Sequence, residues 1–208
     1  MIYIIKIPKW IKNIYHRCVW QIETTEKILY LSFDDGPHPV ATNFVLDTLK
    51  DYGAKATFFC IGDNVAEHPA LYNTIIEQGH TVGNHTYDHL NGWQTDNDRY
   101  FKNIEQAEKL IASTLFRPPY GKITFKQIKY LMAKKQAFKI IMWSVISADF
   151  DENISREKCL KNVLENVESG SIIVFHDSEK AFDNMSFALP KVLEHFAALG
   201  YRFEKIDK

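Results

Sequence analysis

The stretch Leu31-Ser32-Phe33-Asp34-Asp35-Gly36-Pro37 decides how this chain folds. The apolar residues that lead into it predict a buried strand, and Gly-Pro predicts a turn directly after it. Two neighbouring carboxylates at the end of a buried strand are disfavoured by mutual repulsion and by burial. Taken alone, both acids are more typical of a solvated turn or a helix cap than of a functional site. The rest of the chain decides between a turn and a functional site.

Length and composition indicate one folded domain. The chain has 208 residues, of which 46% are hydrophobic and 13% aromatic, enough for one sizeable core. A formal net charge of −1 gives no indication of a nucleic-acid partner. Cys18, Cys60 and Cys159 form no CxxC pair, so neither a disulfide framework nor a thiolate zinc site is expected.

The first 27 residues form an N-terminal segment whose role the sequence leaves open. Its apolar start is interrupted by Lys6 and Pro8 before it reaches the length of a signal peptide or a membrane span. A cytoplasmic monomer is the default expectation, with a peripheral envelope location as the alternative. Apolar residues recur at helical spacing from Trp10 to Val19 and predict an amphipathic helix. We expect segment 1–27 to pack on the core; a helix lying on a membrane surface is the alternative.

Residues 28–208 alternate between strand and helix patterns and predict an α/β catalytic domain with parallel strands. The expected strands are 28–33, 56–61, 80–84, 115–118, 138–146, 171–177 and 201–206. The expected helices are 40–52, 69–78, 97–114, 123–135, 153–168 and 184–199. The repeated pattern fits a parallel sheet that is either open and doubly wound or closed as a barrel, and the seven expected strands are one short of the common eight-stranded barrel.

Polar residues gather at the carboxyl ends of these strands, the edge at which parallel α/β folds build their sites. In chain order they are Asp34, Asp35, His85, Arg117, Asp149 and His176. Scattered surface residues would not be expected to sort in this way.

His85 and His89 are spaced to hold a metal ion. Four residues apart on a helical turn, two imidazoles share one face, and a carboxylate would complete a zinc site with an open position. Thr86 stands where metalloproteases have their catalytic Glu, so a general base must come from elsewhere, and the Asp pair offers one. Two unrelated surface histidines are the alternative.

Two further motifs carry polar side chains. In Arg117-Pro118-Pro119-Tyr120-Gly121 the prolines keep the backbone extended, so Arg117 can point inward while the Tyr120 amide faces a cavity. His176 ends a hydrophobic strand and could protonate a leaving group. A rigid surface loop and a structural histidine are the alternatives.

Together these motifs resemble those of the polysaccharide deacetylase family, also known as the chitooligosaccharide deacetylase homology domain or carbohydrate esterase family four. The resemblance rests on Ser32–Pro37, His85-Thr86-x-x-His89, Arg117–Gly121 and Ile173-x-x-His176, and it extends from about Tyr30 to the C-terminus. It implies a distorted, often seven-stranded β/α barrel. It also implies metal-dependent removal of acetyl groups from N-acetylated or O-acetylated sugars, with an acetylated glycan as substrate.

The resemblance also implies residue roles. Asp34 would be the general base, and Asp35, His85 and His89 would hold one divalent ion, zinc by expectation and cobalt or manganese as alternatives. His176 would be the general acid.

Around these residues, Arg117 would hold Asp34, the Tyr120 amide would help stabilise the oxyanion, and Asp149 would support His176. Residues 143–150 depart from the family pattern, with Ile146 in place of an Asp and Phe150 in place of a Trp, which puts the substrate pocket in doubt. The expected substrate-binding residues are Trp93, Pro119, Tyr120 and Trp143; together with Tyr100, the two tryptophans are equally typical of a core.

Other functions stay open beside the deacetylase. A silent sugar-binding barrel would not need a general base, and an amidohydrolase could act on a C–N bond outside carbohydrates. A glycosidase is disfavoured, because its two carboxylates lie at least about 5 Å apart on either side of the scissile bond.

Overall fold

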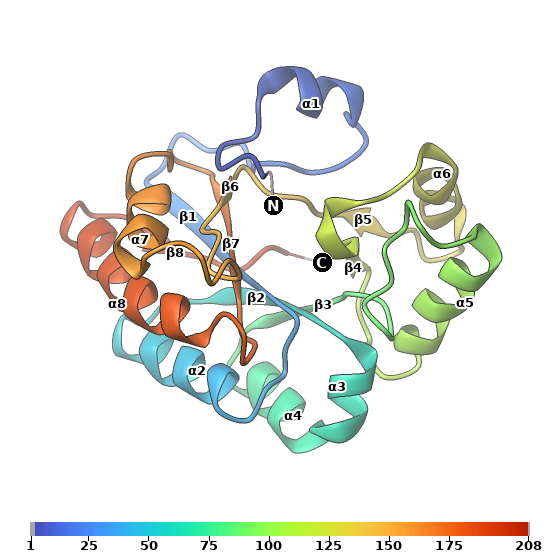
Figure 1. Cartoon of the computed structure of the whole chain (residues 1–208), viewed down its shortest axis with the longest axis horizontal. Helices are drawn as coiled ribbons and strands as arrows, with labels where there is room; N and C mark the ends of the chain where they lie inside the picture. The colour runs from blue at the N-terminus through green and yellow to red at the C-terminus, as the bar shows by residue number, and fades with distance from the viewer. Residues whose placement is uncertain (1–2, 208) are drawn as a thin grey trace.

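The computed structural model describes residues 3–207, and its strands form one parallel sheet that curls around a core. Seven strands follow the order β5-β4-β3-β2-β1-β7-β6, and β8 pairs with β1 beside this path. Helices cover the outside (Figure 1). The expected distorted seven-stranded β/α barrel is thereby confirmed. The strands are β1 (Ile28–Asp34), β2 (Ala56–Cys60), β3 (Thr81–Asn84), β4 (Leu115–Phe116), β5 (Lys139–Ile140), β6 (Val145–Ile146), β7 (Ile172–His176) and β8 (Arg202–Phe203).

The helices follow the strands in the expected alternation, with one addition. The short helix α3 after β2 was not predicted, because its six residues include Gly62 and give no helical pattern. The helices are α1 (Lys9–Ile14), α2 (Ala41–Asp51), α3 (Gly62–Glu67), α4 (Pro69–Glu77), α5 (Asn97–Glu108), the 3-10 turn η1 (Pro119–Gly121), α6 (Phe125–Ala133), α7 (Arg156–Leu164) and α8 (Phe182–Ala198). No helix among residues 3–207 is long and apolar enough to cross a membrane.

The core centres on β1, whose completely buried apolar side chains alternate along the strand and so lie on one face of the sheet. Leu29, Leu31 and Phe33 are completely buried. The Phe33 ring stacks on Phe58 of β2 and Phe175 of β7, with ring centroids 5.1 and 6.2 Å apart. These contacts fix β1 at the centre of the sheet and hold its carboxyl end in place.

The single strand expected over residues 138–146 is wrong. The stretch forms two short strands, β5 and β6, at opposite ends of the sheet path. Ile141 donates a backbone hydrogen bond to Phe116, whereas Ser144 donates one to Ile172. The backbone changes partner within this stretch because β4 lies on one side of it and β7 on the other. Residues 141–144, between β5 and β6, thus connect the two ends of the curled sheet. We call these four residues the seam.

The N-terminal segment runs along the seam. Ile7 donates a backbone hydrogen bond to Ser144, and the Met142 amide donates one to Val19. The helix expected to reach Val19 ends at Ile14, because Val19 forms a β-bridge with Ile141 instead. Trp10 on α1 is accordingly 62% exposed. The division of the chain at residue 27 stays a prediction.

Candidate active site

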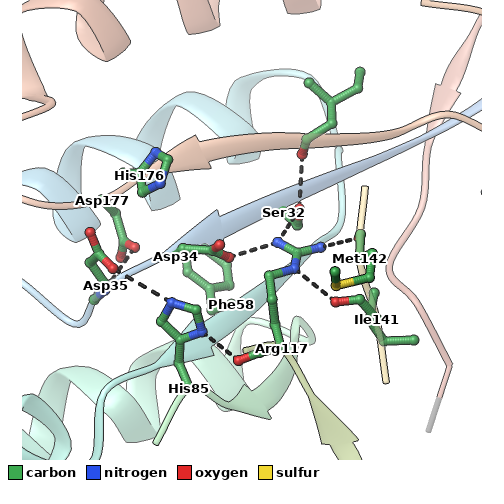
Figure 2. A network of polar contacts seen from close by, with 12 residues as sticks. Ser32, Asp34, Asp35, Phe58, His85, Arg117, Ile141, Met142, His176 and Asp177 are labelled. Atoms are coloured by element: carbon green, nitrogen blue, oxygen red, sulfur yellow. Dashed lines mark hydrogen bonds and ion pairs between the residues drawn. The ribbon is translucent and has the colours of Figure 1, made fainter. Parts of the chain in front are cut away.

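Strand register brings the expected polar residues to one rim of the barrel. Asp34, the last residue of β1, pairs with Phe59 of β2 and with His176 of β7. On the other side, Asn84 at the end of β3 pairs with Phe116 of β4, directly before Arg117. The carboxyl ends of these strands therefore present their polar residues to the same space (Figure 2).

Asp35, His85 and His89 form a set of donor atoms that fits a divalent ion. One donor atom from each lies within 4.8 Å of the others. Asp35 Oδ1 is 3.2 Å from His89 Nε2 and 3.7 Å from His85 Nε2, and this buried oxygen has no hydrogen-bond partner among the described residues. A buried carboxylate oxygen without a partner is costly unless something neutralises it. Two imidazoles and one carboxylate are ligands typical of zinc with an open position.

The environment of these ligands prepares them for a cation. Burial lowers the pKa of His85 to about 4, so its ring is neutral. His85 Nδ1 lies 2.8 Å from the carbonyl oxygen of Arg117, which can only accept, so Nδ1 carries the proton and Nε2 keeps a lone pair. Burial alone would raise the pKa of Asp35, but the neighbouring His89, His176 and His85 lower it well below its usual range.

The expectation that His85 and His89 lie on a helical turn is wrong, although their ring centroids are 5.1 Å apart. Thr86 and His89 have φ angles of 65° and 55°, which no α-helix contains. Asn84 Oδ1 accepts from the Thr86 amide, and Asn103 Oδ1 accepts from the Tyr87 amide. These side-chain contacts replace helical hydrogen bonds and hold the irregular turn.

Arg117 holds Asp34 from inside the barrel. Its side chain is completely buried, and Nη1 donates to Asp34 Oδ1 at 2.6 Å and to Ser32 Oγ at 2.8 Å. Nε and Nη2 donate to the backbone oxygens of Ile141 and Met142 at 3.2 and 2.9 Å, so the guanidinium also fills the seam (Figure 2). Burial lowers the pKa of Arg117, while Asp34 raises it. The ion pair fixes the Asp34 carboxylate at the rim.

His176 is held by Asp149 through two contacts. Asp149 Oδ2 accepts from the His176 amide and Oδ1 lies 2.7 Å from Nδ1, so Nδ1 carries a proton and Nε2 is directed away from Asp149. Burial alone would lower the pKa of His176, but the charge and hydrogen bond of Asp149 raise it to about 10. The histidine is therefore an imidazolium at neutral pH. Phe150 flanks its ring at 5.2 Å, and Tyr3 contacts Phe150 in turn at 5.5 Å.

Residues 117–121 form a tight turn beside the ligands. Tyr120 has a φ of 59°, and its ring lies 4.6 Å from that of His89. The two hydrogen bonds of this turn, Gly121 N to Pro118 O and Lys122 N to Pro119 O, do not use the Tyr120 amide. Non-glycine residues with positive φ concentrate at this rim, where backbone strain marks functional sites. They are Asp35, Thr86, His89, Tyr120 and Ala148.

The expected substrate-binding residues lie at different depths. Pro119 is buried, whereas Tyr120 and Trp93 are each 56% exposed. Trp143 is partly buried, and its ring leaves no room for a Cβ at Gly121. Tyr100 is completely buried and belongs to the core around Phe116. Their contact with substrate stays a prediction.

Asp177 is a site residue that the sequence reasoning missed. It is completely buried and accepts from the Gly36 amide at 3.1 Å and from Thr42 Oγ1 at 2.5 Å. A Cβ at Gly36 would lie 2.1 Å from its Oδ2, so Asp177 packs directly under the turn that carries Asp35. Burial raises the pKa of Asp177 to about 8. Its only signal in the sequence was its position next to His176.

Comparison with known proteins places this geometry in a family. Residues 21–137 match the family model described as polysaccharide deacetylase. The chain is 34% identical over 195 residues to a peptidoglycan-N-acetylglucosamine deacetylase of Bacillus cereus, covering 91% of both proteins. It is 32% identical over 164 residues to a chitooligosaccharide deacetylase of Azorhizobium caulinodans, covering 76% of this chain and 77% of that one.

Solved structures agree with these sequence matches. The crystal structure of the Bc1960 peptidoglycan N-acetylglucosamine deacetylase superposes with a TM-score of 0.86 at 32% identity, covering 94% of both chains. From the matched family model, the relatives over most of the length and the shared barrel, it follows that this chain belongs to the polysaccharide deacetylase family and is a hydrolase.

Proposed function

We propose that this enzyme removes the N-acetyl group from an amino sugar within a polysaccharide, with a divalent ion, zinc in the first instance, held by Asp35, His85 and His89. The proposal is carried by one observation. The three donor atoms of this set lie within 4.8 Å of one another, while Asp34 and His176, each fixed by its own partner, pair across neighbouring strand ends. The relatives named as deacetylases of peptidoglycan and of chitooligosaccharides support an amino-sugar polymer as substrate.

A divalent ion at this position would lower the pKa of a bound water and polarise the acetyl carbonyl. Asp34 is the proposed base that takes the proton of the attacking water. The bond from Arg117 Nη1 at 2.6 Å keeps its carboxylate oriented in a buried place.

His176 is the proposed acid. An amine leaves the tetrahedral intermediate readily only when it is protonated, so the group that donates must hold its proton at working pH. The Asp149 carboxylate keeps His176 protonated, with Nε2 as the ring atom that is free to donate. Asp34 and His176 thus lie on neighbouring strand ends, each held by a partner of opposite charge.

The Tyr120 amide is the proposed donor to the oxyanion. It belongs to a tight turn fixed by Pro118 and Pro119, so its position costs no rearrangement during the reaction. With a φ of 59° at Tyr120 the backbone turns instead of continuing the strand, and the ring of this residue contacts the proposed ligand His89. The other candidate, a silent sugar-binding barrel, explains neither the held base nor the charged acid.

Acetate release from a panel of N-acetylated and O-acetylated glycans tests the proposal. We expect release from an N-acetylated amino-sugar polymer, its loss after treatment with a chelator and its return with added zinc or cobalt. Asp34→Asn serves as the matched control, since it keeps the proposed ligands and removes the base. If the metal-loaded protein binds the glycans but releases no acetate, the silent barrel is the better description.

A further inference from the structure

An exposed aromatic and basic surface begins at the proposed metal ligands. It consists of the exposed Tyr120 and Trp93 and the half-buried Lys122, and we call it the outer ledge. Tyr120 contacts His89 at a ring distance of 4.6 Å, and Trp93 follows His89 by four residues, which limits their Cα separation to about 14 Å. The outer ledge therefore extends from the site over a distance that neighbouring rings of one glycan chain can cover.

Trp93 is held firmly although more than half of its surface is in water. Its Nε1 donates to the carbonyl oxygen of Ile123 at 3.0 Å. The buried Gln127 donates from Nε2 to the carbonyl oxygen of Gly92 at 2.8 Å, which holds the backbone next to Trp93 in place. An indole that is 56% exposed forgoes much of the hydrophobic stabilisation that burial would give. A large ring that is held in place and left exposed beside the proposed metal ligands offers a flat apolar face for stacking on a sugar ring.

Lys122 supplies a cation without an anionic partner. Its ammonium lies 4.1 Å from the centroid of the Trp93 ring, which places it in cation–π contact. Within residues 3–207, no side chain or backbone group accepts a hydrogen bond from this ammonium or forms an ion pair with it. A carboxylate on a ligand that covers Trp93 could occupy this position.

The surroundings of the outer ledge are cationic as well. The segments 3–22 and 118–148 contain no Asp or Glu, although the whole chain carries a net charge of −1. The two segments lie together, because Tyr15 stacks on Phe125 with ring centroids 5.1 Å apart, and α1 and α6 are on the same side of the molecule (Figure 1). Their basic residues are Lys6, Lys9, Lys12, Arg17, Lys122, Lys126, Lys129, Lys134, Lys135 and Lys139. Lys134 is paired with Glu105 and Glu108, and Lys6 with Glu168, so the excess of positive charge near the outer ledge comes from the remaining basic residues.

We propose that the outer ledge binds a sugar ring bearing a carboxylate, in the same glycan chain as the ring that is deacetylated. Trp93 offers an apolar face to the ring, Lys122 pairs with the carboxylate, and Tyr120 joins this subsite to the metal ligands. The inference rests on the proposed function and specifies its substrate class. That class is an acidic amino-sugar polymer, and a neutral polymer lacks the partner for Lys122.

Equilibrium binding to the metal-loaded Asp34→Asn protein tests the inference without turnover. The probes are soluble peptidoglycan glycan strands that keep their carboxylates and neutral N-acetylated chitin oligomers of equal length. We expect the acidic strands to bind about tenfold more tightly at low salt, with the difference shrinking as salt screens the charges. Trp93→Ala should weaken the binding of both probes about tenfold. Lys122→Gln should remove only the advantage of the acidic strands.

Matched controls are Trp10→Ala, an exposed tryptophan on α1, and Lys50→Ala, an exposed lysine on α2, which should leave the binding of both probes unchanged. Equal affinity for the two probes, or an equal loss on both after Lys122→Gln, would overturn the inference. Unchanged binding after Trp93→Ala would do the same. Because binding is measured without turnover, absence of acetate release by the parent protein would contradict the proposed function and leave this result interpretable.

Discussion

At the scale of single residues, two adjacent acids occupy different environments because the backbone turns between them. Asp34 ends β1 in the strand and meets Arg117, whereas Asp35 has a φ of 81° and faces the two histidines. The left-handed backbone of Asp35 sends its carboxylate to the other side of the rim. Two adjacent residues thus serve as a candidate base and a candidate metal ligand. Their charges have different partners, Arg117 for Asp34 and the histidines for Asp35.

Replacing each acid separately tests this division. Asp34→Asn should keep the metal and lose about 10²–10⁴-fold in kcat, since a general base contributes that much. Asp35→Asn should weaken metal binding by more than the roughly 10–100-fold that loss of an outer-shell partner costs. Metal content after dialysis and kcat with saturating metal separate the two effects. Equal metal affinity in both variants would contradict the assignment.

The pH dependence of the reaction should report His176. An acid donates only while it is protonated, so kcat/KM falls as pH rises through the pKa of His176, which Asp149 raises to about 10. Asp149→Asn removes the charge that raises this pKa and leaves burial, which lowers it. The alkaline limb of the profile should therefore move to lower pH and activity at neutral pH should fall, with metal content unchanged.

Phe150→Trp is the control for the Asp149 experiment. Phe150 contacts the His176 ring but carries no charge. We therefore expect Phe150→Trp to change KM and to leave the alkaline limb of the kcat/KM profile at the same pH. If the Asp149→Asn profile coincides with that of the parent in position and height, Asp149 has a purely structural role.

The raised pKa of His176 also makes folding stability depend on pH. The stabilisation that comes from the His176–Asp149 pair is complete below about pH 6.5 and is lost as pH rises toward 10.

Single residues also show how far the sequence could predict the site. Asp34, Asp35, His85, Arg117 and His176 were predicted at one rim because polar residues that end parallel strands must meet there. Asp177 and Thr42 could not be found this way. Their contact depends on how α2 packs against the end of β7, and a buried acid next to a histidine has no distinguishing pattern of its own.

At the scale of elements, the turn that carries Tyr120 depends on Gly121. Gly121 has a φ of 65°, and a Cβ there would lie 2.7 Å from the Trp143 ring. We expect Gly121→Ala to lower kcat/KM and stability together, because the turn must shift away from Trp143. A left-handed Ala alone costs about 1–2 kcal/mol. Thermal unfolding and acetate release measure the two effects.

Gly53→Ala is the matched control for this turn. Gly53 has a similar φ of 58°, but nothing lies within 4 Å of its added Cβ. It should lose stability through the backbone alone and keep full activity. Equal activity losses in the two variants would show that the Tyr120 turn has no special part in the reaction.

The short strands and the end of α1 show which parts of the fold the sequence could not predict. The long strands were predicted because apolar runs and glycine caps mark them in the chain. Residues 138–146 were predicted as one strand, because hydrophobic periodicity indicates which side chains are buried but not which strand lies alongside. The change of partner within this stretch, from Phe116 to Ile172, is decided by the curvature of the whole sheet. For the same reason the pattern could not predict that α1 ends at Ile14.

At the scale of the whole molecule, metal binding should stabilise the fold. Asp35 comes from the loop after β1, whereas His85 and His89 come from the loop after β3, so an ion on all three would tie two separate loops together. A ligand that binds only the folded state raises stability by about 2.7 kcal/mol at 100 times its Kd. Chelation should therefore lower Tm, and added zinc should restore it in the parent but not in Asp35→Asn. An unchanged Tm after verified metal removal would contradict this coupling.

Arg117 has a wider consequence for the evolution of this barrel. One guanidinium both orients Asp34 and donates to two carbonyls of the seam, so replacing Arg117 would remove both sets of contacts at once. Selection for a stable fold and selection for turnover therefore act on the same side chain. Lineages that abandon catalysis would still be constrained to keep this arginine, whereas the metal ligands would be free to drift. Retention of Arg117 is thus a poor marker of an active enzyme, and loss of Asp35, His85 or His89 is the more informative sign that activity has been given up.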